Sequence, residues 1–120
     1  MTDTEQNWHA IGSEADFPED NKWTAILGGW SVLVVRTEEG LNAVNDRCTH
    51  LAALLSPGRI RRGAIICPLH GARFEADTGR CIGGLYADLR RFEVRIVDGV
   101  IEVAVPSSPP GPGERPVAQA

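Results

Sequence analysis

Two short segments of this 120-residue chain each pair a cysteine with a histidine. The first is Cys48-Thr49-His50, the second is Cys67-Pro68-Leu69-His70, and sixteen residues separate His50 from Cys67. Thiolate is a soft donor that suits iron–sulfur clusters or zinc, and imidazole suits iron, zinc or copper. Cys48, His50, Cys67 and His70 are therefore candidate ligands of one metal centre, supplied by two loops.

Zinc is the competing metal. Structural zinc sites usually combine a Cys-x₂₋₄-Cys pair with a His-x₃₋₅-His pair. Here each pair is mixed, and a single residue separates Cys48 from His50. The spacing therefore favours an iron–sulfur centre, and a structural zinc-binding interaction module stays as the alternative from another functional class.

The elements that must position these pairs are predicted to be short strands. Thr24–Leu27 and Trp30–Thr37 flank Gly28-Gly29, a strong hairpin signal. From Phe92 to Ile96 apolar and charged residues alternate, as in a half-buried strand, and a tight turn then leads into Val100–Val105. Because no segment shows a long helical period, we expect an all-β fold, a small antiparallel sandwich or barrel.

The length and composition predict one globular domain followed by a tail. Hydrophobic residues make up 42% and charged residues 23% of the chain, as in ordinary soluble domains. From Pro106 onward the chain is rich in proline and glycine and has no core-forming pattern. We therefore place the domain at residues 1–105 and expect residues 106–120 to be a flexible tail.

The formal charge of −4 argues against nucleic acid as a partner and suits brief docking on a basic patch of another protein. Arg59, Arg61 and Arg62 form a local basic run, which is either a solvated turn or a contact for an acidic partner. The polar N-terminus predicts no secretory signal, and the uncharged stretch Trp23–Val35 is too short to span a bilayer. We expect a cytoplasmic protein without a membrane segment, in a compartment where thiols stay reduced.

The double motif resembles that of the Rieske proteins, and above all the small Rieske-type ferredoxins of multicomponent aromatic-ring dioxygenases. The residues that carry the resemblance are the two Cys–His pairs and the segment Asp77-Thr78-Gly79-Arg80, and it extends from about Trp8 to Val105. It implies a Rieske fold, in which two hairpin loops form a cluster-binding subdomain that holds one [2Fe–2S] cluster. By this resemblance Cys48 and Cys67 bind the inner iron, and His50 and His70 bind the outer iron near solvent.

The resemblance also implies a function. The chain would be a soluble one-electron carrier and not itself an enzyme. It would pass electrons from a flavin-dependent ferredoxin reductase to a terminal Rieske non-haem iron oxygenase in aromatic hydrocarbon catabolism, and it would be a monomer. The alternative within the same class is a permanent Rieske small subunit of a larger redox enzyme, such as a nitrite reductase.

Departures from the sequence pattern of the respiratory Rieske proteins bear on the expected reduction potential of the cluster. Ala53 and Leu69 stand where the respiratory proteins have two disulfide-forming cysteines, and Ala72 and Phe74 replace residues with hydroxyl groups. Fewer hydrogen bonds to the cluster predict a potential at the low end of the Rieske range, about −150 mV.

The segment 81–87 lacks the proline that often covers the cluster in this family, so Leu85 and Tyr86 are candidate replacements. The third cysteine, Cys81, has no matching histidine. It is expected to be a small buried apolar residue.

Overall fold

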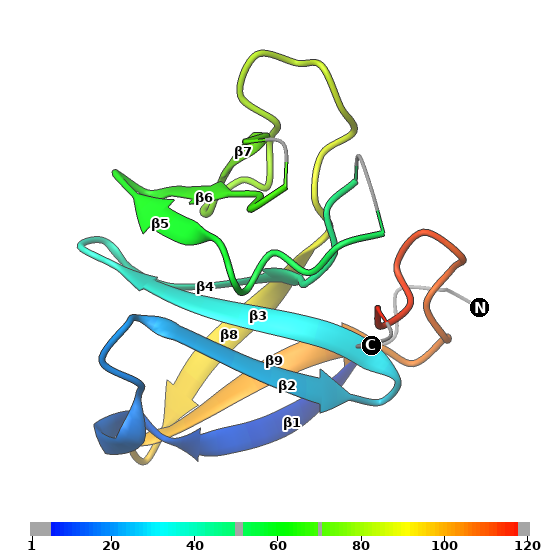
Figure 1. Ribbon diagram of the computed structural model, residues 1–120. Coiled ribbons are helices and arrows are strands. Elements are labelled where there is room, and N and C mark those ends of the chain that lie inside the picture. The colour runs from blue at the N-terminus through cyan, green and yellow to red at the C-terminus, as the bar shows by residue number, and fades with distance from the viewer. Residues whose placement is uncertain (1–5, 50–51, 70, 118–120) are drawn as a thin grey trace.

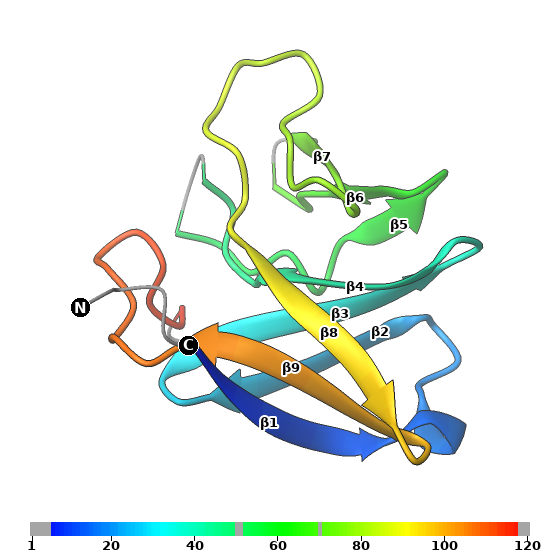
Figure 2. The same ribbon diagram turned by 180° about the vertical axis from the view of Figure 1, so that it is seen from behind.

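The computed structural model describes residues 6–49, 52–69 and 71–117, and within them the fold is all-β, as predicted. A six-stranded antiparallel sheet, in the order β1-β9-β8-β4-β3-β2, curls into a nearly closed barrel, and a small sheet β5-β6-β7 lies beside it (Figures 1 and 2). The elements are β1 (Gln6–Ser13), a 3₁₀ turn (Glu14–Asp16), β2 (Lys22–Leu27), β3 (Trp30–Thr37), β4 (Gly40–Asn45), β5 (Arg59–Arg61), β6 (Ala64–Ile66), β7 (Arg73–Glu75), β8 (Arg91–Val97) and β9 (Val100–Pro106).

The predicted hairpin at Gly28-Gly29 is confirmed. Leu27 pairs with Trp30, and the two glycines between them have φ angles of 56° and 89°. Two consecutive positive φ values are what a two-residue turn between twisted strands requires, and glycine adopts them without steric cost. This turn sets the register of β2 on β3.

Strand β3 is buried on both faces and separates two hydrophobic clusters. Val32 and Val34 point into the barrel interior, where they pack with residues such as Phe92. Leu33 and Val35 point to the other side, into a cluster that contains both Cys48 and Cys67. Since successive side chains of a strand face opposite ways, the apolar run from Val32 to Val35 contributes to both clusters.

The small sheet and its loops form one excursion from the barrel, between β4 and β8. These two strands are neighbours, with Ala43 opposite Phe92 and Val44 opposite Arg91. At the neck of the excursion the Asn45 amide donates to the Arg90 carbonyl over 2.9 Å. The chain therefore leaves the barrel and returns to it at one place, and residues 46–90 form a subdomain on the outer face of β3 and β4 (Figure 1).

The start of the predicted tail makes contacts with the barrel. Trp30 Nε1 donates to the Ser108 carbonyl over 3.0 Å, and Asn45 Nδ2 donates to the Glu114 carbonyl over 3.1 Å. The Glu114 carboxylate also forms an ion pair with Arg90 at 2.5 Å. These contacts hold the segment beside the neck of the subdomain, while the boundary at residue 105 and the flexibility of residues 106–120 stay predictions.

Among the described residues, no helix has the length and apolar character needed to cross a membrane.

Candidate metal centre

The two predicted thiol ligands lie in one apolar cluster of the subdomain. Cys48 follows β4 and is 2% exposed, while Cys67 directly follows β6 and is 1% exposed. Both pack in the same group of buried side chains, to which β3, β4, β6 and β7 contribute. The structure thus brings together two cysteines that are nineteen positions apart in the sequence. The other two predicted ligands, His50 and His70, lie outside the described residues.

The two cysteine loops close in the same way. The Cys48 amide donates to the Ala53 carbonyl over 2.9 Å, and the Cys67 amide donates to the Ala72 carbonyl over 2.7 Å. In each loop the bond spans five residues, and the predicted histidine ligand falls inside the span. Each loop is therefore a turn of the same size, with a buried thiol at its start.

A buried carboxylate fixes the first loop. Asp46 is 2% exposed, and its Oδ1 atom accepts hydrogen bonds from the backbone amides of Leu55 at 2.8 Å and Ser56 at 2.9 Å. Because these bonds join the two ends of the segment that carries Cys48, they hold the loop closed. The sequence offered no local signal for this role, since the partners lie nine and ten residues ahead.

The second loop is fitted against the first by a glycine. Gly58 is buried, and a Cβ atom added to it would come within 1.8 Å of the Ile66 carbonyl oxygen. No side chain fits that space. The backbone that follows the first cysteine loop therefore runs directly against β6, the strand that ends just before Cys67.

The segment 81–90 reaches over to the first loop. Thr49 Oγ1 donates to the Ala87 carbonyl over 2.5 Å, and the Asp88 carboxylate accepts from the Cys81 amide over 3.1 Å. Tyr86 packs against the apolar cluster that holds the two thiols, whereas Leu85 is 78% exposed. Of the two predicted substitutes for the missing proline, Tyr86 is the one that contacts this core.

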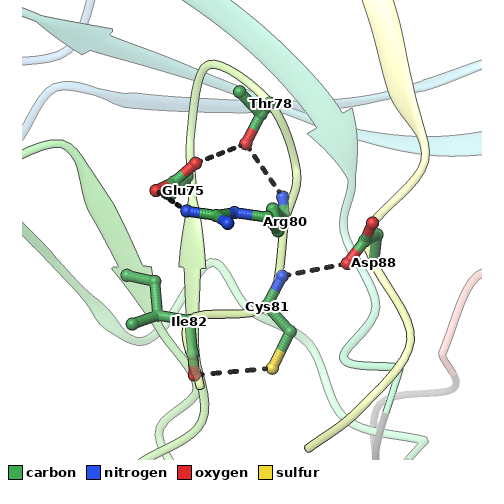
Figure 3. Close-up of polar contacts among 6 residues, drawn as sticks. All are labelled: Glu75, Thr78, Arg80, Cys81, Ile82 and Asp88. Atoms are coloured by element: carbon green, nitrogen blue, oxygen red, sulfur yellow. Dashed lines mark hydrogen bonds and ion pairs between the residues drawn. The ribbon is translucent and has the colours of Figure 1, made fainter. Parts of the chain in front are cut away.

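The turn before this segment is held by a polar network (Figure 3). The Glu75 carboxylate accepts from Arg80 over 3.0 Å and from the Thr78 hydroxyl over 2.6 Å. The hydrogen bond from Arg80, and then that from Thr78, lowers the pKa of Glu75, and the same contact with Glu75 raises the pKa of Arg80. Glu75 therefore stays ionised at neutral pH. The segment Asp77–Arg80, which carried part of the family resemblance, forms a turn closed by these hydrogen bonds.

Cys81, which follows this turn, is 4% exposed and belongs to the same core as the two predicted ligands. Its Sγ atom lies 3.8 Å from the Ile82 carbonyl oxygen, as Figure 3 shows. The expectation that Cys81 is a small buried residue is confirmed. None of the three cysteines forms a disulfide in the described structure.

The apolar surroundings of the thiols fit a metal-bound cluster. Phe74 is fully buried and Ala72 is 9% exposed. The two residues that stand where respiratory Rieske proteins have hydroxyl groups therefore contribute only hydrocarbon side chains to this core. A thiolate in such surroundings is costly unless a metal balances its charge, and coordination also removes the thiol proton. Two buried thiols with soft sulfur donors match an iron–sulfur cluster.

Comparison with known proteins agrees with this chemistry. The Rieske [2Fe-2S] domain family matches residues 7–93. The anthranilate 1,2-dioxygenase ferredoxin subunit of Burkholderia cepacia is 35% identical over 100 residues, which cover 82% of this chain and 92% of that protein. The ferredoxin component of the naphthalene 1,2-dioxygenase/salicylate 5-hydroxylase systems of a Ralstonia species is 32% identical over 92 residues, with 76% and 88% covered.

A solved structure has the same fold. The structure is the complex of reduced oxygenase and oxidized ferredoxin in carbazole 1,9a-dioxygenase, and one of its chains superposes with a TM-score of 0.72 at 28% identity. The match covers 79% of this chain and 99% of that one. The family match, the near-complete overlap with the two ferredoxin relatives and the buried thiol pair lead to one conclusion. This chain belongs to the Rieske [2Fe–2S] domain family and carries one [2Fe–2S] cluster.

Proposed function

We propose that this protein is the one-electron carrier of an aromatic-ring dioxygenase system. In this proposal it receives electrons from a flavin-dependent ferredoxin reductase and delivers them to a terminal oxygenase in the cytoplasm. The observation that carries the proposal is the pair of buried thiols, each at the start of a loop of the same span. Two relatives that are ferredoxin components, matched over 92% and 88% of their own length, support it.

The ligand set of the proposal is Cys48, His50, Cys67 and His70. Cys48 and Cys67 would hold the cluster from the protein core, and His50 and His70 would hold it from the solvent side. The bound cluster supplies reversible one-electron redox chemistry. Neutral imidazole brings less negative charge than thiolate, so a mixed ligand set raises the potential relative to four cysteines.

The chain itself contributes rigidity and the exclusion of water. Both thiols are at most 2% exposed, and the Asp46 carboxylate and the Thr49 hydroxyl tie the first loop to its neighbours. A cluster held in this way undergoes little rearrangement when its charge changes by one unit. No second set of histidine ligands is available for a mononuclear iron site, because His9 is the only other histidine in the sequence. We therefore assign the oxidation of the aromatic substrate to the partner oxygenase.

The purified protein should be brown and should bleach when it takes up one electron per chain in an anaerobic titration. Gel filtration of extract from its host should find it as a small free protein that contacts its partners only transiently. Elution in constant ratio with a large enzyme would instead identify a permanent subunit and contradict the shuttle. A colourless protein that contains zinc would overturn the whole assignment.

The reduction potential should lie at the low end of the Rieske range, about −150 mV. The reason is that Ala72 and Phe74 carry no hydroxyl group, so neither side chain can stabilise the added negative charge with a hydrogen bond. A spectroelectrochemical titration measures this value. The variant Phe74→Tyr tests the cause, because it adds one hydroxyl and should raise the potential. A clearly positive potential in the wild-type protein would contradict this account.

A further inference from the structure

The charge of the chain is distributed unevenly between the barrel and the subdomain. Residues 46–90 carry seven arginines and four carboxylates, whereas the rest of the chain carries five basic and twelve acidic residues. The subdomain that holds the two thiols is therefore positive, although the whole chain has a formal charge of −4. A partner that approaches the subdomain meets a field opposite in sign to the net charge.

The positive charge is concentrated on one face of the small sheet. Ile60, Ile65 and Phe74 point inward and pack in the core with the two thiols. Since side chains alternate along a strand, the residues between them occupy the outer face. There the register places Arg59 and Arg73 on either side of Ile66, and both arginines are exposed.

This row of Arg59, Ile66 and Arg73 adjoins the second cysteine loop. Ile66 directly precedes Cys67, and Arg73 directly follows Ala72, whose carbonyl closes that loop. Leu69, within the same loop, is 62% exposed. The row therefore places two cationic side chains beside the loop that carries the exposed apolar side chain of Leu69. Arginine together with apolar side chains is typical of protein contact surfaces.

The charges of the row are not neutralised from within the protein. Arg80, Arg90 and Arg95 each form an ion pair with a glutamate, while Arg59 and Arg73 form none with any described residue. Glu75, the carboxylate on the same outer face, is already bonded to Arg80. Arg62, at the end of the sheet, lines a groove with Glu38, Glu39 and Asp77, so we do not count it in the row.

We infer that the row Arg59–Ile66–Arg73 is the docking surface for a carboxylate-rich protein face of an electron-transfer partner. The inference rests on the proposed function. It also reverses, for this face, the expectation from net charge that the protein docks on a basic patch. Complementary charge of this kind chiefly raises the rate of association and orients the encounter.

The test uses small redox ions of known charge. Reduced holoprotein is mixed in a stopped-flow instrument with anionic hexacyanoferrate(III), and separately with cationic tris(phenanthroline)cobalt(III). Net charge alone would repel the anion, and added salt would speed its reaction. We expect the reverse, a rate that falls as salt screens the attraction at the row. The rate with the cationic reagent should rise with added salt.

The double variant Arg59→Gln/Arg73→Gln should react with hexacyanoferrate about tenfold more slowly at low ionic strength. The control Arg91→Gln/Arg95→Gln removes the same amount of charge from β8 and should retain the falling salt dependence. Poly-L-glutamate, as a mimic of an acidic protein face, should slow the reaction of the wild-type protein and of the control but not that of the row variant.

A wild-type rate that rises with salt, or equal inhibition of all variants by poly-L-glutamate, would overturn the docking surface. Failure of the proposed function would be seen separately and earlier, since the protein would then lack the brown colour or would not take up one electron before mixing.

Discussion

Replacement of Cys67 by alanine should give a protein without its [2Fe–2S] cluster, whereas replacement of Cys81 should leave the cluster in place. Both thiols are buried in the same apolar core, at 1% and 4% exposure, so the two variants remove the same atom from similar surroundings. Cys67 begins a loop that matches the loop at Cys48, while Cys81 follows the turn closed by Glu75 and Arg80. We expect loss of a ligand in the first case and only a small cavity in the second.

The measurement is iron and sulfide content per chain, together with the visible spectrum. Cys67→Ala should contain no stoichiometric iron, and Cys81→Ala should match the wild-type protein. The same assay applies to His50→Ala and His70→Ala, each of which should lose the cluster or its characteristic spectrum. The ligand assignment is wrong if either histidine variant keeps the spectrum unchanged, or if the outcomes for the two cysteines are exchanged.

The second large effect is expected at Asp46. The variant Asp46→Ala would leave the buried Leu55 amide and the Ser56 amide without their acceptor. A buried donor that loses its partner costs about 1–3 kcal/mol, so the closed first loop should be destabilised by about 3 kcal/mol. This corresponds to an increase on the order of 100-fold in the population of the opened loop.

First-order bleaching of the holoprotein at elevated temperature measures this opening, because cluster loss follows exposure of the thiols. Asp46→Asn keeps one oxygen acceptor and should bleach at a rate between those of the wild type and the alanine variant. Asp20→Ala is the matched control. Asp20 also accepts a backbone amide, from Lys22 at 3.3 Å, but it is exposed, and its loss should change the rate little. Equal effects at Asp20 and Asp46 would show that burial is not the cause.

The parts of the structure that the sequence predicted are those encoded by local patterns. The hairpin around Gly28-Gly29 was recognisable because the turn residues are adjacent and both flanking strands are long. The apolar alternation from Phe92 to Ile96 likewise matches β8. The two cysteine loops were recognisable because each Cys–His pair lies within four residues.

The parts that were not predicted depend on contacts distant in sequence. Strands β5, β6 and β7 have three residues each, too few to show a period of two. The anchoring role of Asp46 depends on amides nine and ten residues away, and an aspartate before a loop is usually solvated. The contacts of Glu114 with Asn45 and Arg90 join residues at least 24 positions apart, so composition alone gave no sign of them.

The single neck between β4 and β8 has a consequence for how the protein matures. Both ends of the segment 46–90 meet at the hydrogen bond from Asn45 to Arg90, so pairing of β4 with β8 already closes this long loop. None of the predicted cluster ligands lies in a strand of the six-stranded sheet, because all of them fall within the segment 46–90. The barrel is therefore expected to fold before the cluster is inserted. Cluster assembly then follows as a late step, on a scaffold that already holds the bases of both cysteine loops.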